Sequence, residues 1–301
     1  MQPGLQRLSP PARHLTPVAP GSRHQREKLA VFSRFASQAL VQAPGFDCMP
    51  ALRTLALQAS IEHPQLMAWD GSTLTCHALG VSVGPQGMED LKSGAFGLGD
   101  EIGRCLTQLP PEWRLAGLLS LAFAEDFAVV RSGDATVPWM AVALPSSWAP
   151  ELKVGHHFAH IHAPVADADR LRASGQALMR LVVSGDAWER WVWTVTAHSR
   201  LHAHPERLDP KGWQPTLESS EPLATRAWWR TERQTFLAIP GYDQAVFTIR
   251  VDLQPLTQVI HSPQRARRLH DALASMSPAV LDYRGLTPVR ETLLSWLESL
   301  G

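Results

Sequence analysis

The sequence contains few cysteines, and this excludes several kinds of site. Its 301 residues include three, Cys48, Cys76 and Cys105, which lie far apart and form no C-x-x-C pair. They cannot supply a disulfide framework, an iron–sulfur ligand set or a structural zinc site. Such sparse cysteine usage fits a reducing compartment, and we expect a cytoplasmic protein.

Long apolar runs and an excess of one charge are also missing. No run of about 18 apolar residues occurs, so no membrane span is expected, and the first ~24 residues lack the apolar core of a secretory signal. Lysine plus arginine and aspartate plus glutamate both number 28. This balance gives no reason to expect nucleic acid or a membrane surface as a partner. No G-x-G-x-x-G motif follows a predicted strand, so we expect no dinucleotide site in this chain.

The composition is that of a globular protein with an aromatic interior. Hydrophobic residues make up 45% of the sequence, and there are 11 tryptophans, which favour a wide aromatic core or a cofactor pocket. Helical patterns come first, strands dominate the middle and helices close the chain, which predicts an α+β fold on an antiparallel sheet. We expect residues 1–24 to form a flexible, proline-rich arm and residues 25–301 to form a single domain.

Hydrophobic periodicity and turn signals predict the individual elements. The expected helices are Glu27–Val41, Leu52–Glu62, a segment from Asp167 or Asp169 to Val183, Pro263–Met276 and Pro288–Leu300. Met88–Leu109 is expected to form one helix broken around its glycines, or two short helices. The expected strands are Ala116–Phe123, Asp126–Val130, Trp139–Leu144, Glu189–Ala197, Ala227–Ile239 and Gln244–Leu253.

Histidine is concentrated in one short stretch, Glu151–Asp169. Four of the 13 histidines, His156, His157, His160 and His162, lie there within seven residues. Imidazole is a common ligand of transition metals and of haem iron, so the cluster indicates a ligand site. One hypothesis is a zinc or other metal hydrolase built on His156, His160 and His162. The loop histidines His202 and His204 remain alternative ligands.

The last two predicted strands carry many polar side chains. Alternation along a strand puts Arg230, Glu232 and Gln234 on one face of the first strand, and Arg250 and Asp252 on one face of the second. If these polar faces coincide, arginines and carboxylates form a cross-strand ladder. The ladder is either a solvated surface with weak ion pairs or the polarised wall of a ligand pocket.

Several motifs together resemble a known family. The segments W-W-R-T-E-R-Q-T-F-L-A-I-P, at residues 228–240, and A-V-F-T-I-R, at residues 245–250, resemble the signature of the haem-dependent oxidative N-demethylase family, formerly a domain of unknown function. The stretches Ala124–Phe127, Leu144–Trp148 and Val154–Val165 resemble three further family segments. Their order and spacing hold over residues 50–286.

The resemblance implies a PAS-like antiparallel sheet with flanking helices that enclose a b-type haem. It also implies oxidation of a small methylated amine such as dimethylamine by O2, which yields monomethylamine and formaldehyde. This chain would be the haem-binding alpha subunit, reduced by a separate NADPH-dependent partner with flavin and a 2Fe-2S cluster. A non-catalytic haem-based gas or redox sensor of the same fold is the alternative.

The resemblance also assigns roles to residues. His162 matches the histidine of the family's I-H-x-P-V segment and is the expected axial ligand of the haem iron. His160 is a second cofactor-side residue, although its family position is usually not histidine. The expected catalytic residues are Glu232, Arg230 and Arg250, where the arginines bind a propionate or shape the substrate side, and Glu232 pairs with an ammonium or delivers a proton.

Other matched positions carry less specific expectations. Arg233 and Gln234 belong to the R-x-E-R-Q-T block and are expected to bind the cofactor. Glu125 and Asp126 match an acidic pair of the family, with a structural or a functional role. The sequence departs from the family pattern at Ala124 and Val251, and these departures bear on the dimethylamine specificity.

Overall fold

A seven-stranded antiparallel sheet lies at the centre of the molecule, in the strand order β1-β9-β10-β11-β7-β8-β2. The computed structural model describes residues 4–91, 96–161, 168–209, 212–213 and 222–301, with residues 168–174 described by their backbone alone. The strands of this sheet are β1 (Gln6–Arg7), β2 (Leu40–Gln42), β7 (Glu125–Arg131), β8 (Thr136–Ala141), β9 (Trp188–Thr196), β10 (Trp228–Ala238) and β11 (Gln244–Pro255).

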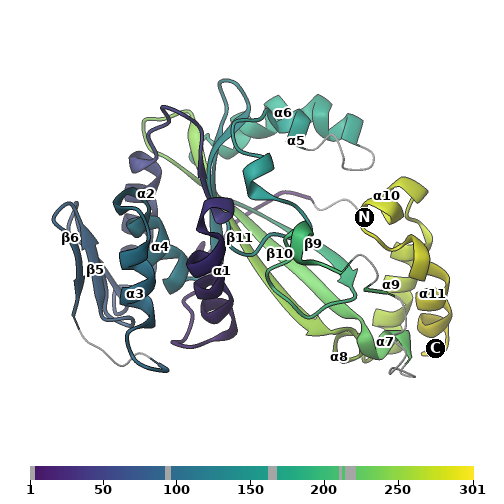
Figure 1. The fold of residues 1–301 in the computed structure, drawn as a ribbon. Coiled ribbons are helices and arrows are strands. Elements are labelled where there is room, and N and C mark those ends of the chain that lie inside the picture. The colour runs from purple at the N-terminus through teal and green to yellow at the C-terminus, as the bar shows by residue number, and fades with distance from the viewer. Residues whose placement is uncertain (1–3, 92–95, 162–167, 210–211, 214–221) are drawn as a thin grey trace.

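A second, smaller sheet has four antiparallel strands in sequential order. In Figure 1 it lies at the far left, outside the N-terminal helices, and those helices separate it from the central sheet. Its strands are three or four residues long: β3 (Met67–Trp69), β4 (Leu74–Cys76), β5 (Val81–Gly84) and β6 (Gly87–Asp90).

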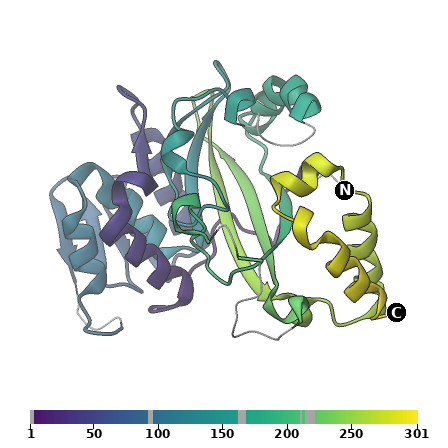
Figure 2. The ribbon, with the colours of Figure 1, turned by 45° about the vertical axis from the view of Figure 1, so that its right-hand side comes forward.

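The helices fall into three groups around the central sheet. Figure 2 shows the N-terminal group on one side of the sheet and the C-terminal group on the other, with α5 and α6 at the top. The N-terminal group is α1 (Arg23–Ala39), α2 (Met49–Glu62), α3 (Glu101–Gln108) and α4 (Arg114–Ala122). The connection between β8 and β9 contains α5 (Phe158–Ile161) and α6 (Ala168–Val182). The later helices are α7 (Leu223–Arg226), α8 (Leu256–Val259), α9 (Pro263–Ala274), α10 (Pro278–Tyr283) and α11 (Arg290–Glu298).

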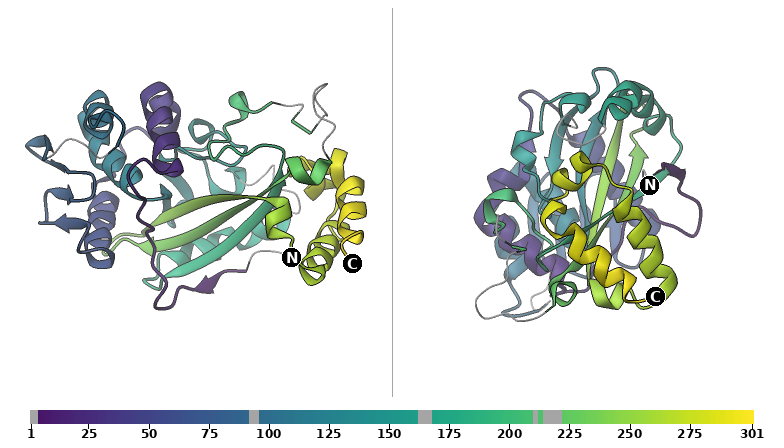
Figure 3. Two further views of the ribbon diagram at one scale, coloured as in Figure 1. Left: turned by 90° about the horizontal axis from the view of Figure 1, so that it is seen from below. Right: turned by 90° about the vertical axis from the view of Figure 1, so that its right-hand side faces the viewer.

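Each helix group buries its own apolar cluster. The largest cluster lies under the N-terminal helices and includes Trp139, which is fully buried and stacks on Trp113. A second joins α9, α10 and α11 to the stacked pair Trp193 and Trp229 at one end of the sheet. A third packs α5 and α6 onto Phe236 and other residues near the tip of the β10–β11 hairpin. The right-hand panel of Figure 3 shows the C-terminal helices in front of the sheet.

The strand expected at Ala116–Phe123 is wrong, because this segment forms helix α4. Its residues from Leu115 to Ala122 are buried on every side, so the sequence shows no polar face that would reveal a period of 3.6. A short, continuous apolar run fits a buried strand and a buried helix equally well.

Of the broken helix or two short helices expected at Met88–Leu109, only the part after the glycines is helical among the described residues. Residues 87–90 form strand β6, and helix α3 begins only at Glu101. Gly97 and Gly99 adopt positive φ angles of 54° and 91° between these elements, a conformation that an α-helix does not contain. The periodic apolar residues on either side therefore belong to separate elements.

The N-terminal segment, which the sequence predicts as a flexible arm, contacts the body of the protein at several points in the structure. Strand β1 pairs with β9, and His14 and Leu15 are 5% and 2% exposed. The Glu62 carboxylate accepts hydrogen bonds from the backbone N–H groups of both residues. The left-hand panel of Figure 3 shows this dark purple segment running along the central sheet.

In the described part of the chain, the structure contains no helix with the length and apolar character needed to cross a membrane. The expected α+β class and antiparallel sheet are confirmed.

The acidic pair at the start of β7 belongs to a buried structural network. Lys28 on α1 is fully buried, and its Nζ lies 3.1 Å from Oδ1 of Asp126 and donates to the carbonyls of Phe123 and Glu125. Asp126 also accepts a 2.6 Å hydrogen bond from the N–H of Leu144. Burial raises the pKa of Glu125. These contacts hold α1 against the sheet.

We expect Lys28→Met to destabilise the protein by about 3–5 kcal/mol, because it leaves a buried carboxylate without its cation. Denaturant unfolding monitored by circular dichroism measures this loss. Arg104→Gln is the control, since it removes an exposed ion pair with Asp100 and should change stability by less than about 1 kcal/mol. Equal effects of the two substitutions would contradict the structural role of Lys28.

Candidate functional site

The register of the β10–β11 hairpin distributes its polar side chains over both faces of the sheet. Ala238 pairs with Ala245, so even-numbered residues of β10 share a face with odd-numbered residues of β11. Arg230 is therefore opposite Leu253, and Arg233 is opposite Arg250. The expected ladder that combines Arg230 and Glu232 with Arg250 is wrong. We call the two sides the Arg230 face and the Arg233 face.

On the Arg230 face, β9 and β10 form a partly exposed polar surface. Gln234 pairs across the strands with Arg190, and its Oε1 accepts a hydrogen bond from Arg190 Nε. Gln234 Nε2 in turn donates to Glu232 Oε2 at 2.6 Å. We call this surface the β9–β10 patch; it consists of Arg190, Val192, Thr194, Arg230, Glu232 and Gln234.

Arg230 is the buried end of the patch and has a structural task. Its side chain is 2% exposed and donates to Ser146 Oγ at 2.8 Å and to the carbonyls of Pro145, Arg200 and Leu201 at 2.9–3.1 Å. All these acceptors are uncharged. Burial lowers the pKa of Arg230 to about 10, so the side chain stays protonated at neutral pH and its charge remains beneath the patch.

Two buried polar atoms near Arg230 lack a partner among the described residues. Thr194 pairs with Arg230 across the strands, and its Oγ1 makes no hydrogen bond. His198 follows β9 on the same side, and its Nδ1 is also unpartnered. Burial, together with the Arg230 charge, lowers the pKa of His198 to about 4. Thr194 and His198 thus each contain a buried polar atom whose hydrogen-bonding capacity is unused among the described residues.

The arginines of the other face are paired with acids and with the N-terminal segment. Arg233 Nε donates to Glu189 at 3.0 Å. Arg250 donates to Asp252 at 2.8 Å and to Thr16 Oγ1 at 3.0 Å. The structure thus separates Arg233 and Arg250 from Glu232, although the sequence predicted all three for one site.

The histidine stretch contributes exposed imidazoles on and before α5. The rings of His156 and His160 stack with their centres 4.8 Å apart, and both residues are exposed. His162, the expected axial ligand, lies outside the described residues. In the described ranges, no three side chains of His, Cys, Asp or Glu are grouped so that they could hold a metal ion.

The alternative ligands His202 and His204 lie in the loop after β9. Both ring nitrogens of His204 are engaged: Nε2 is 3.0 Å from Glu151 Oε1, and Nδ1 accepts from the N–H of Glu206. His202 Nδ1 lies 2.6 Å from the Ala143 carbonyl and must donate to it, because a carbonyl only accepts. His202 Nε2 is buried, without a partner among the described residues. His204 is thus committed to structure, while His202 retains a free lone pair.

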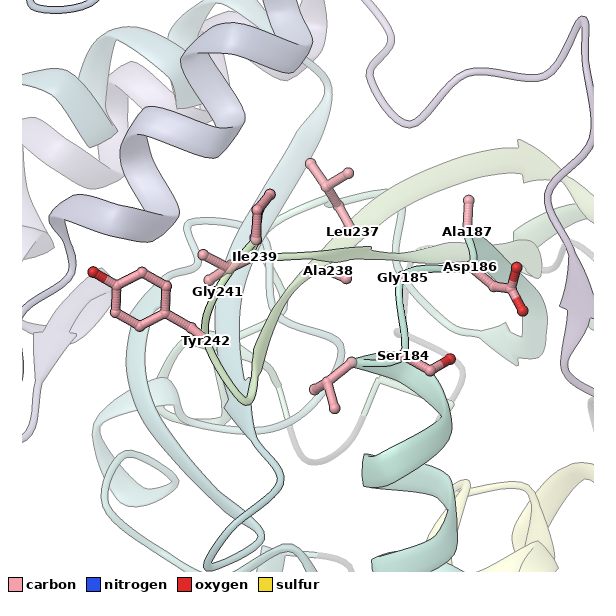
Figure 4. Close-up of a pocket in the computed structure, with 11 residues that line it drawn as sticks. Ser184, Gly185, Asp186, Ala187, Leu237, Ala238, Ile239, Gly241 and Tyr242 are labelled. Carbon is pink, nitrogen blue, oxygen red and sulfur yellow. The ribbon is translucent and has the colours of Figure 1, made fainter.

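One cavity of about 370 Å³ lies between the turn after α6 and the tip of the β10–β11 hairpin. Figure 4 shows Asp186 and Tyr242 at opposite ends of this cavity. Asp186 is already paired with Arg7 at 2.9 Å, and no histidine lines the cavity. Its volume is near the lower limit for a small-molecule pocket, roughly 300–1,000 Å³. We assign no cofactor to it.

Residues 102–294 match a family described as haem-dependent oxidative N-demethylase, alpha subunit-like. The chain belongs to this family. The match begins in helix α3, ends in α11 and includes every strand of the central sheet from β7 to β11. The family name connects the chain with haem, with oxidative N-demethylation and with an assembly in which an alpha subunit has a partner.

The charges of the described residues on the Arg230 face suit the carboxylates of a haem. Haem has two carboxylates and an apolar ring. The β9–β10 patch contains two arginines against one glutamate, and the unpartnered atoms of Thr194 and His198 lie beside it. Trp188 and Phe236 continue the same face with apolar side chains, which pack in the cluster under α5 and α6. Guanidinium groups suit the acidic side chains of a porphyrin.

Sequence reasoning missed three residues of this surface, Arg190, Thr194 and His198. The alternation of Glu189–Ala197 does place Arg190 and Thr194 on one side of a strand, but it does not show which residues of the neighbouring strand lie opposite them. The signal in the sequence was the presence of Arg190 and Thr194 on one side of a strand that also contains several tryptophans.

We expect Arg230→Lys to destabilise the protein by about 3 kcal/mol or more, because an ammonium cannot reach the four acceptors that the guanidinium bonds. Denaturant unfolding measures the stability, and hydrogen exchange at residues 200–203 reports the loosened loop. Arg250→Lys is the matched control, since Arg250 is partly exposed and should cost about 1 kcal/mol. Unchanged exchange in that loop would contradict the assignment.

We expect His198 to make stability depend on pH between about 6.5 and 4. Its pKa is about 4 in the folded protein and about 6.5 in the unfolded chain, so the unfolded chain binds the proton first. The stabilising contribution is complete above pH 6.5 and is lost as the pH falls to 4, up to about 3 kcal/mol. His198→Gln should flatten this slope in unfolding curves, whereas His77→Gln, at an exposed position, should not. Identical slopes in the wild type and His198→Gln would refute the prediction.

Proposed function

We propose that this protein is the haem-binding subunit of an enzyme that oxidatively removes a methyl group from a small methylated amine, such as dimethylamine. The family match supports haem and N-demethylation as the chemistry. The observation that carries the proposal to this chain is the Glu232 carboxylate. One of its oxygens is held by Gln234, and the other has no partner among the described residues, on a partly exposed surface.

The fold around the patch supports a PAS-like arrangement. Strands β7 to β11 form five adjacent antiparallel strands, and the connection between the second and third of these strands contains α5 and α6. Both helices pack on the Arg230 face through Phe158, Met179 and Val182. A cofactor between these helices and the patch would have the sheet as one wall.

Within this proposal, His162 would hold a b-type haem through its imidazole, because it matches the histidine of the I-H-x-P-V segment. Bound haem would supply the oxygen chemistry that oxidises the methyl carbon. Gln234 orients Glu232, as the hydrogen bond between them shows. Glu232 then pairs with the ammonium form of the substrate or transfers its proton. Arg230 keeps the two neighbouring loops fixed and takes no part in binding.

The overall reaction requires electrons from outside the chain. Dimethylamine, O2, two electrons and two protons give monomethylamine, formaldehyde and water. The sequence has no dinucleotide motif and no cysteine set for an iron–sulfur cluster. We therefore propose a separate NADPH-dependent reductase with flavin and a 2Fe-2S cluster as the partner.

We expect the protein, expressed with ample haem, to show a Soret band, and to release formaldehyde from dimethylamine when a reductant and O2 are supplied. His162→Ala should lose the band or shift it strongly, because the iron loses its axial nitrogen. His160→Ala and the control His157→Ala, both at exposed positions, should keep the wild-type spectrum. Glu232→Gln should keep the spectrum and lower the rate by about 100-fold or more, as expected for a positioned acid–base group.

Different outcomes would refute different parts of this proposal. A protein that stays colourless with ample haem is not a haem subunit. A haem-loaded protein that binds small gases but yields no formaldehyde with any reductant is a sensor and not an enzyme. An unchanged spectrum in His162→Ala would assign the iron to another histidine, and His202→Ala would then be the next variant to record.

A further inference from the structure

Arg190 lies on the Arg230 face and uses only one edge of its guanidinium there. Its Nε donates to Gln234, and no partner among the described residues contacts its two terminal nitrogens. Neither terminal nitrogen is among the buried, unsatisfied atoms, and the Arg190 side chain is partly exposed. A guanidinium with one edge fixed and the other open is suited to bind a carboxylate through two parallel hydrogen bonds.

The other arginines of these strands are already engaged. Arg230 uses its donors on one hydroxyl and three carbonyls. Arg233 pairs with Glu189, and Arg250 pairs with Asp252, both on the opposite face. Arg190 is therefore the arginine of this group that has both the position and the free donors to bind an anion on the Arg230 face.

The charge of the β9–β10 patch also favours an anion. Arg190 and Arg230 provide two positive charges, Glu232 provides one negative charge, and none of the three makes a salt bridge with a described residue within 4 Å. Burial lowers the pKa of Arg190, and Glu232 opposes this shift in part. Partly buried charge without a counter-ion is unfavourable, so a bound carboxylate would stabilise this surface.

We propose that Arg190 binds a propionate carboxylate of the haem through its terminal nitrogens, with Gln234 fixing the guanidinium. This inference rests on the proposed function, because it takes haem as the ligand. It differs from the sequence-based assignment, which gave this role to Arg230, Arg233 or Arg250. Once Arg190 is neutralised by a propionate, the patch has no net attraction left for a further anion, and the open oxygen of Glu232 can face a cationic amine.

The test compares haem with its dimethyl ester, in which both propionates are uncharged. Apoprotein is titrated with each compound, and the absorption change gives the two dissociation constants. We expect Arg190→Gln to reduce the ratio of haem affinity to ester affinity by roughly 10- to 100-fold, which corresponds to the loss of one or two hydrogen bonds to a charged group. Arg190→Lys should restore part of this ratio, because it keeps the charge without the bidentate geometry.

Arg131→Gln is the matched control, since Arg131 lies at the end of β7 and pairs with Asp134 on an exposed surface. Its ratio should equal that of the wild type. An unchanged ratio in Arg190→Gln would overturn the assignment of Arg190 while the haem-binding proposal stands. A wild-type protein that binds neither compound would overturn both. A loss of affinity for both compounds by the same factor would assign Arg190 a structural role and would also overturn the inference.

Discussion

The pairing of Ala238 with Ala245 determines where every polar residue of the β10–β11 hairpin lies. A slip of one residue would move Arg250 onto the face of Glu232 and would separate Phe236 from Phe247. In the observed register these two rings stack with centres 4.8 Å apart, and the hydroxyls of Thr235 and Thr248 are 2.7 Å apart on the opposite face. Cross-strand pairs of this kind stabilise one register over its neighbours. The location of the candidate site therefore follows from packing contacts that bind no ligand.

The parts of the fold that could be predicted are the segments whose hydrophobic pattern clearly follows either the helical or the strand period. The hairpin, β9, α6 and α9 all lie where alternation or helical spacing placed them. Helix α4 could not be identified, because a helix buried all round has no polar stripe, and the strands of the small sheet are too short to establish a period. The position of the N-terminal segment depends on contacts with residues far away in the sequence. One example is the hydrogen bond between His14 and Thr235, which are 221 positions apart. No local pattern contains that information.

The sequence predicted which types of residue form the candidate site, but it did not predict their hydrogen-bond partners. The motif around Glu232 indicated the correct strand, and alternation correctly grouped Arg230, Glu232 and Gln234. What a guanidinium bonds depends on loops that approach from elsewhere in the chain. Arg230 contacts carbonyls some 30 and 85 positions away, and Arg190 contacts a side chain 44 positions away. The sequence thus identified Arg230 and Glu232 but missed Arg190, and the division between a structural arginine and an open one required the structure.

The difference between the structural Arg230 and the open Arg190 affects the order in which ligands would bind. The charge of Arg230 is permanent and its acceptors are neutral, so it acts on the whole β9–β10 patch through a medium of low dielectric constant. With Arg190 also charged, the patch repels an ammonium despite the carboxylate of Glu232. If a haem propionate neutralises Arg190, one positive and one negative charge remain, and Glu232 is the nearer of the two to solvent. In this scheme, the cofactor prepares the surface for a cationic substrate, and amine recognition by Glu232 depends on prior occupancy of Arg190.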